Sequence, residues 1–214
     1  MLEKMKTAIF DMDGTLVDSM GHWRGMSIRF LEARGIHPTP AEQEKIRTTN
    51  GIATADWFRE HYGLAVTHDD LERESCAGME PVYRAGVALK PGAEAYLRHL
   101  TQTGVRPVLA TATPAYLVLT ALNRTGLLRY FDYILTADMT GCSKGDPAFF
   151  TRLLQETGAR PEECVLFEDS LYAIRSAKRF GIPSVGIADS SNVRDEEAMR
   201  AETLRFIHDF AEIM

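Results

Sequence analysis

Residues 7–15 read TAIFDMDGT, and this stretch decides the fold. Four residues that suit a buried strand are followed abruptly by two acidic residues, Asp11 and Asp13, and then by Gly14. A short apolar run of this kind is typical of a parallel strand covered on both faces. The acidic residues would therefore lie just beyond the carboxyl end of a buried strand.

Four further apolar runs of strand length follow in the second half of the chain. They are 107–110, 133–135, 164–167 and 184–187. Amphipathic segments at 91–102, 114–124, 147–156 and 171–180 separate them, with glycines 104, 126, 158 and 181 as helix-ending residues. Strand and helix in this alternation predict an α/β fold, a doubly wound and mostly parallel sheet of Rossmann-like type.

Residues 17–86 interrupt this alternation and contain no convincing strand pattern. The sequence Thr39-Pro40-Ala41-Glu42 is typical of a capping box at a helix start, and Thr54 and Thr67 could cap further helices. We therefore expect a catalytic core of residues 1–16 and 87–214 and an inserted, all-helical cap domain of residues 17–86.

Composition restricts the class of protein. The formal charge of the 214-residue chain is −6, which argues against a nucleic-acid surface. The three cysteines are far apart, so neither a disulfide framework nor a CxxC metal site is expected. No apolar run is long enough to cross a bilayer, and the N-terminus becomes acidic too early for a signal peptide. We expect a cytoplasmic monomer or homodimer.

Polar residues gather where the predicted strands end. In a doubly wound sheet, ligands bind outside the carboxyl ends of the strands. The residues expected at that edge are Asp11, Asp13, Thr111, Lys144, Glu168 and Asp169. Four carboxylates would face one ammonium group, and like charges at short range demand a counter-ion. Oxygen ligands beside a phosphate suit Mg²⁺, and a carboxylate can act as the nucleophile in phosphoryl transfer.

The chain resembles the haloacid dehalogenase superfamily, in particular its phosphatase and phosphomutase branch with a helical cap after the first strand. Four motifs occur in the family's order and cover essentially the whole chain. They are DMDGT at 11–15, LATAT at 109–113, Lys144 with DPAFF, and LFEDS at 166–170.

The resemblance implies a role for each core residue. Asp11 would be the nucleophile that carries an aspartyl-phosphate, and Asp13 would be the general acid and base. Thr111 would bind the transferring phosphoryl group, and Lys144 would neutralise Asp11 and the phosphoryl oxygens.

The same resemblance implies a Mg²⁺ site and a phosphate cradle. Asp11, the backbone carbonyl of Asp13, and Asp169 would hold the metal, with Glu168 a ligand directly or through water. Backbone amides of Met12, Asp13 and Ala112 would help to bind phosphate. Relatives usually have Lys-Pro where this chain has Lys144-Gly145, so we expect Lys144 to be held less firmly.

Three functions remain open at this point. The first is a phosphatase of a small phosphorylated metabolite, and the second is a phosphomutase of the β-phosphoglucomutase type. Thr54 stands where that mutase branch usually has an arginine, which favours the phosphatase. The third is a catalytically silent phosphate-binding regulatory protein, against which the two aspartates of the first motif speak. Dehalogenase and phosphonatase relatives lack Asp13.

Substrate specificity is expected in the cap, with Asn50 and Thr54 as candidates.

Overall fold

The computed structural model describes residues 4–47, 49 and 51–214 of the chain. The chain divides into two compact units, Met1–Met20 with Gly86–Met214, and Gly21–Ala85. The first unit contains the sheet and the second contains helices.

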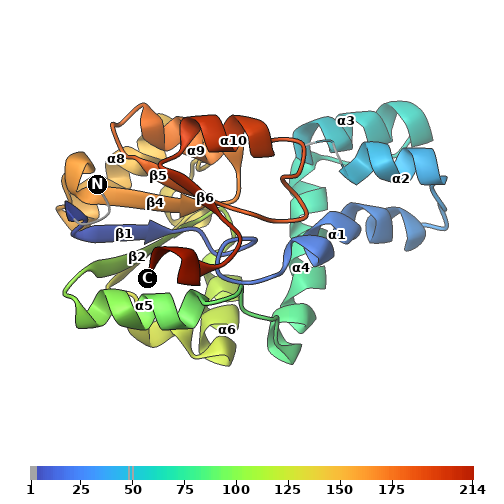
Figure 1. Ribbon diagram of the computed structural model, residues 1–214. Coiled ribbons are helices and arrows are strands. Elements are labelled where there is room, and N and C mark those ends of the chain that lie inside the picture. Colours follow the sequence, from blue (N-terminus) through green and yellow to red (C-terminus); the bar gives the residue numbers. More distant parts are fainter. Residues whose placement is uncertain (1–3, 48, 50) are drawn as a thin grey trace. The chain divides into compact units, whose positions relative to one another are not determined.

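The first unit is built on a six-stranded parallel sheet (Figure 1). The strand order is β3-β2-β1-β4-β5-β6. The strands are β1 (Thr7–Phe10), β2 (Arg106–Thr111), β3 (Tyr133–Thr136), β4 (Cys164–Glu168), β5 (Ser184–Ile187) and β6 (Arg205–Ile207). The order reverses at β1, and such a reversal opens a crevice at the carboxyl ends of the central strands. The predicted doubly wound α/β fold is therefore confirmed.

Helices cover both faces of this sheet, as Figure 1 shows. One face carries α5 (Ala93–Gln102) and α6 (Ala115–Thr125), and the opposite face carries α8 (Pro147–Thr157), α9 (Leu171–Lys178) and α10 (Glu196–Glu202). The remaining short elements of this unit are α7 (Ala137–Thr140) and the 3-10 helices η2 (Leu127–Tyr130), η3 (Pro161–Glu163) and η4 (Phe210–Ile213). Right-handed crossovers place connections on opposite faces when the chain reverses its direction across the sheet.

Alternate residues of β1 pack into the two hydrophobic layers. Ile9 belongs to a buried cluster with Phe149 and Phe150 of α8. Its neighbour Phe10 stacks on Phe167, with ring centroids 4.5 Å apart, and meets Tyr96 of α5 edge to face. Both faces of the central strand are therefore buried from solvent, which explains its continuous apolar sequence.

The sixth strand was missed by the sequence analysis. β6 has only three residues, lies at the edge of the sheet, and begins with the exposed Arg205. A run this short carries too little periodicity to be distinguished from a loop. Its pairing with β5, such as Val185 with Arg205, exists only in the folded sheet.

Among its described residues, the second unit contains helices joined by loops and no strand. The helices are α1 (Met20–Glu32), whose first residue belongs to the first unit, α2 (Pro40–Arg47), α3 (Gly51–Tyr62) and α4 (His68–Ala85). The predicted capping box precedes α2, where Glu42 Oε2 accepts from the Thr39 amide at 2.7 Å. Thr67 likewise caps α4 through Asp70. The expectation that Thr54 caps a helix is wrong, because it lies inside α3.

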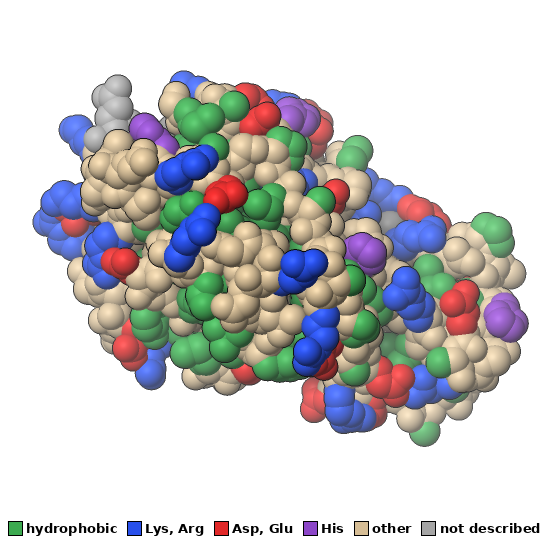
Figure 2. Space-filling view, turned by 90° about the horizontal axis from the view of Figure 1, so that it is seen from below, with side chains coloured by type: hydrophobic (Ala, Val, Ile, Leu, Met, Phe, Trp, Pro, Cys, Tyr) green, Lys and Arg blue, Asp and Glu red, His purple; other side chains and the backbone are tan. Residues whose placement is uncertain are grey.

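Two surface properties complete the description. No helix among the described residues is long and apolar enough to span a membrane. On the face drawn in Figure 2, Lys and Arg side chains are interspersed with Asp and Glu.

Candidate active site at the carboxyl edge of the sheet

The loop after β1 places Asp11 and Asp13 at the carboxyl edge. The Asp11 amide donates to the carbonyl of Phe167, which extends the pairing of β1 with β4 by one residue. The chain then turns, and the Gly14 amide donates to the Val17 carbonyl. Gly14 has φ of +78°, and a Cβ there would lie 2.3 Å from Oδ2 of Asp169. Glycine is therefore required both by the backbone conformation and by the approach of the Asp169 carboxylate.

Lys144 joins Asp11 to Glu168. Its Nζ lies 2.7 Å from Oδ1 of Asp11 and 2.5 Å from Oε2 of Glu168, and its side chain is 1% exposed. Burial alone would lower the pKa of Lys144, but the two carboxylates outweigh burial and raise it, so the ammonium is charged. The Gly145 carbonyl, in the residue after Lys144, accepts a hydrogen bond from Ser176 Oγ at 3.3 Å. The looser hold on Lys144 than in relatives with Lys-Pro stays a prediction.

Asp13 is oriented by two hydroxyl groups. Ser19 Oγ donates to Oδ1 at 2.5 Å, and Thr113 Oγ1 donates to Oδ2 at 2.6 Å. All three residues are buried. This role of Ser19 and Thr113 was not predicted from the sequence. The sequence feature that could have pointed to them is their position: Thr113 lies in the second motif with Thr111, and Ser19 lies shortly after the first motif.

Three buried carboxylates lie close enough to share a metal ion. Among the described residues, Asp11, Glu168 and Asp169 each offer an oxygen within 4.8 Å of the others. Burial raises the pKa of Asp11 to about 7, against the lowering effect of Lys144. Burial, with Glu168 and Asp11 nearby, also raises the pKa of Asp169 well above its ordinary value. The single positive charge of Lys144 therefore does not compensate the negative charge of the three carboxylates. A set of oxygen ligands of this kind fits a hard divalent cation.

Asp169 is tied to the loop after β5. The side-chain amide of Asn192 donates to the Asp169 carbonyl at 2.8 Å, and Ser191 Oγ lies 3.4 Å from Asp169 Oδ2. Neither residue was singled out from the sequence, in which the run Ser190-Ser191-Asn192 resembles an ordinary turn.

The core residues expected at the site lie together at this edge. Thr111 ends β2 and is fully buried, and its Oγ1 accepts from the Thr113 amide at 3.2 Å. Met12 is a buried residue of the loop after β1, and Ala112 is an exposed residue at the start of the loop after β2. Thr54 lies in the other unit, buried on α3, where its hydroxyl donates to the Thr49 carbonyl at 3.4 Å. Asn50 lies outside the described residues.

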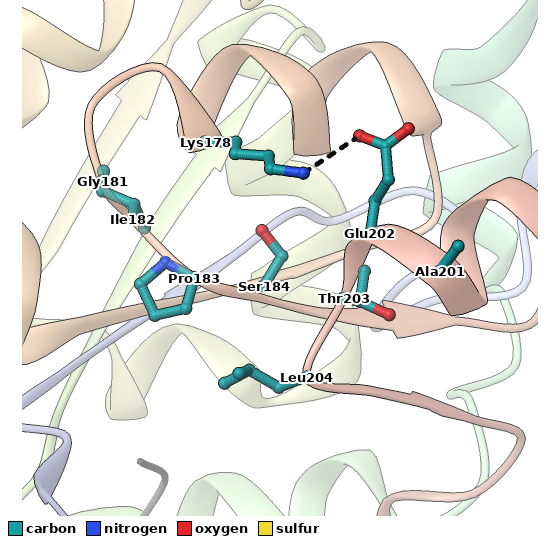
Figure 3. A pocket seen from close by; sticks show the side chains of 9 residues that line it. All are labelled: Lys178, Gly181, Ile182, Pro183, Ser184, Ala201, Glu202, Thr203 and Leu204. Atoms are coloured by element: carbon teal, nitrogen blue, oxygen red, sulfur yellow. Dashed lines mark ion pairs between the residues drawn. The ribbon is translucent and has the colours of Figure 1, made fainter.

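A separate hollow lies at the opposite edge of the sheet. It has a volume of about 360 Å³ and lies at the amino end of β5, between the ends of α9 and α10 (Figure 3). Lys178 and Glu202 form a loose ion pair beside it, with Nζ and Oε2 3.7 Å apart. None of the residues expected at the active site lines this hollow.

Comparison with known proteins agrees with the fold. The family model described as haloacid dehalogenase-like hydrolase matches residues 5–181. The putative phosphatase YhcW of Bacillus subtilis is 30% identical over 185 residues, 85% of this chain and 82% of its own length. The phosphorylated carbohydrates phosphatase of Thermotoga maritima is 28% identical over 198 residues, 88% of each chain.

A solved structure also superposes over nearly the full chain. A mutant of CbbY from Rhodobacter sphaeroides, crystallised with xylulose-(1,5)bisphosphate, gives a TM-score of 0.81 at 25% identity, over 98% of this chain and 96% of that one. The parallel sheet with helices on both faces places the chain in the α/β class of proteins. The family model describes the matched proteins as hydrolases. The chain belongs to the haloacid dehalogenase-like hydrolase family. Within it, the chain is a phosphatase-type enzyme.

Proposed function

We propose that this phosphatase hydrolyses the phosphate monoester of a small metabolite through an aspartyl-phosphate on Asp11, with Mg²⁺ as its cofactor. The observation that carries the proposal is the buried cluster of Asp11, Lys144, Glu168 and Asp169 at the carboxyl edge of the sheet. Asp13 lies in the same loop as Asp11, with a carboxylate fixed by two hydroxyls.

In the first step, a carboxylate oxygen of Asp11 attacks phosphorus, and the ester P–O bond breaks. Asp13 donates a proton to the departing alkoxide. The Lys144 ammonium already contacts Asp11, so it would oppose the charge of the phosphoryl oxygens without needing to move. Thr111 Oγ1 would donate a hydrogen bond to one of those oxygens, and the amides of Met12, Asp13 and Ala112 would contribute to the same cradle.

In the second step, water attacks the phosphorus of the aspartyl-phosphate. Asp13, now ionised, accepts a proton from this water, and the bond between phosphorus and Asp11 breaks. Inorganic phosphate leaves, and both aspartates return to their starting states. Fixing Asp13 through Ser19 and Thr113 would keep its carboxylate aimed for both proton transfers.

The residues that would hold Mg²⁺ are Asp11, Asp169, the backbone carbonyl of Asp13 and, directly or through water, Glu168. Bound there, the cation would neutralise charge on the phosphoryl oxygens and on the carboxylates around them. The same three carboxylates are buried, and the pKa values of Asp11 and Asp169 are raised. These are the properties of a site that gains stability when a cation binds.

Substrate choice is assigned in this proposal to the helical insertion, residues 17–86, with Asn50 and Thr54 as candidate residues. Sugar phosphates are the first compounds to test, because one relative is named a phosphorylated carbohydrates phosphatase and CbbY was crystallised with a sugar bisphosphate. A β-phosphoglucomutase activity ranks lower, since Thr54 occupies the position of the arginine usual in that branch. A silent binding protein ranks lowest, because phosphate binding alone does not require both Asp11 and Asp13.

The test is phosphate release from a panel of phosphorylated sugars, nucleotides and small acids, with Mg²⁺ present, removed by chelator, and restored. We expect phosphate release that is lost with the chelator and recovered with Mg²⁺. Hexose 1-phosphates should yield inorganic phosphate rather than the 6-phosphate isomer. Full turnover in metal-free buffer would refute the metal assignment, and efficient isomerisation would reverse the ranking of phosphatase over mutase.

Replacing Asp13 by asparagine should slow turnover by roughly 10²–10⁴-fold, the usual contribution of a general acid and base. The amide fits the site, because the hydroxyls of Ser19 and Thr113 can accept as well as donate. The nucleophile remains, so phosphoenzyme should form slowly and persist. Rapid-quench measurement of protein-bound phosphate and steady-state phosphate release would test this.

The exposed Asp69 of α4 offers a matched control, since Asp69→Asn makes the same chemical change in the other unit. Turnover near that of the unchanged enzyme in Asp13→Asn, with the fold intact, would remove Asp13 from the proposed mechanism.

A further inference from the structure

Asn192 is a buried polar residue that the mechanism above does not use. It lies in the loop after β5 and is 5% exposed. Its Nδ2 donates to the carbonyls of Asp169 at 2.8 Å and Ile187 at 2.7 Å, while its Oδ1 accepts from the Asp189 amide at 3.2 Å. A primary amide has two N–H donors and one carbonyl oxygen, so all of these groups are engaged.

These bonds begin where the sheet ladder ends. The last register pair of β4 and β5 is Glu168 with Gly186. Asp169 directly follows β4, Ile187 is the last residue of β5, and Asn192 bridges their carbonyls. The side-chain amide therefore continues the connection between the strands for one more residue. An aspartate would place oxygens against two carbonyl oxygens, and an aliphatic residue would leave buried groups without partners.

The loop that carries Asn192 is itself fixed. Asp189 Oδ2 lies 3.0 Å from Nζ of Lys90, and its Oδ1 accepts from the Ser191 amide at 2.8 Å. Lys90 also donates to the Ala188 carbonyl at 2.8 Å. The backbone amide of Asn192 closes the turn by donating to the backbone carbonyl of Asp189 at 3.1 Å. Asn192 thus reaches Asp169 from a turn that is closed by its own hydrogen bonds and anchored by Lys90 at its start.

The position of the Asp169 carboxylate is sensitive to any movement of its backbone. Its Oδ2 lies so close to Gly14 that a Cβ there would be 2.3 Å away. Ser191, the neighbour of Asn192, lies 3.4 Å from the same oxygen through Oγ. We propose that Asn192 is a positioning residue that fixes the backbone of Asp169, and thereby its carboxylate, for a divalent cation. This inference rests on the proposed function, which assigns Asp169 to the metal site.

The test compares Asn192→Leu, a neutral change of similar size, with Asn192→Ala, in which water can replace the amide. Asn123→Leu, at an exposed position on α6, is the matched control. Mg²⁺ binding to the free protein is followed as the rise in Tm across a Mg²⁺ titration. Partners that orient a metal ligand typically contribute 10–100-fold to metal affinity, so we expect about tenfold weaker Mg²⁺ binding in both Asn192 variants.

Kinetics with p-nitrophenyl phosphate distinguish positioning from a general loss of structure. The Mg²⁺ concentration for half-maximal rate should rise about tenfold, while the KM for p-nitrophenyl phosphate at saturating Mg²⁺ stays within about twofold of the unchanged enzyme. If both variants bind Mg²⁺ as tightly as the enzyme without substitutions, the inference about Asn192 is wrong and the proposed function is unaffected. Loss of the fold in both would also overturn the inference, by assigning Asn192 to stability. If the enzyme without substitutions neither binds nor needs Mg²⁺, the proposed metal site is wrong, and the inference about Asn192 falls with it.

Discussion

Asp11→Asn is expected to abolish turnover, with a loss on the order of 10⁴–10⁶-fold, as observed when other enzymes lose a covalent nucleophile. An amide is a very poor nucleophile, so no phosphoenzyme should form. The fold should survive. Burial raises the pKa of Asp11 to about 7, so ionising this carboxylate costs the folded protein free energy. In the variant, Lys144 keeps its contact with Glu168. Removing the Asp11 charge should leave the free energy of unfolding unchanged or slightly higher.

Three measurements separate loss of chemistry from loss of structure in this variant. Steady-state phosphate release gives turnover, acid-quenched protein gives covalently bound phosphate, and urea denaturation gives stability. Asp69→Asn, at an exposed position of α4, controls for the substitution itself. Protein-bound phosphate in Asp11→Asn at the level of the unchanged enzyme would place the nucleophile elsewhere.

Lys144→Met should reduce both stability and turnover. The substitution leaves the carboxylates of Asp11 and Glu168 buried without the ammonium that lies 2.7 Å from one and 2.5 Å from the other. Removing one partner of a buried ion pair typically lowers the free energy of unfolding by about 3–5 kcal/mol. Turnover should fall by about 10²–10³-fold, because a charged donor to the phosphoryl oxygens is lost.

Mg²⁺ should recover part of the lost stability of this variant, because a cation would neutralise the same carboxylates. The readout is the urea-unfolding free energy with and without Mg²⁺. Lys178→Met is the matched control, since that side chain is 63% exposed and its ion pair with Glu202 is loose. A change of less than about 0.5 kcal/mol in Lys144→Met, as is typical of surface positions, would contradict the assigned role of Lys144.

The central part of the fold could be predicted from local sequence. The strand at residues 7–10 is apolar because both of its faces are covered, and this leaves a pattern in adjacent residues. The helix starts at Thr39 and Thr67 were also visible, because capping depends on residues three positions apart. The helix start predicted at Thr54 is wrong, since a threonine inside a helix and one at its start look alike in the sequence.

The sequence by itself determined the α/β class and the helical insertion, and it predicted candidate site residues at the strand ends, because strand ends and short motifs are local features. Those candidates are Asp11, Asp13, Thr111, Lys144, Glu168 and Asp169. Only the tertiary structure decided that Thr113 and Ser19 orient Asp13, that β6 closes one edge of the sheet, and that Asn192 bridges β4 and β5. Asp13 and Thr113 are 100 residues apart, and Asp169 and Asn192 are 23 apart. Contacts over such separations follow from the order of the strands in the sheet, which no local sequence pattern encodes.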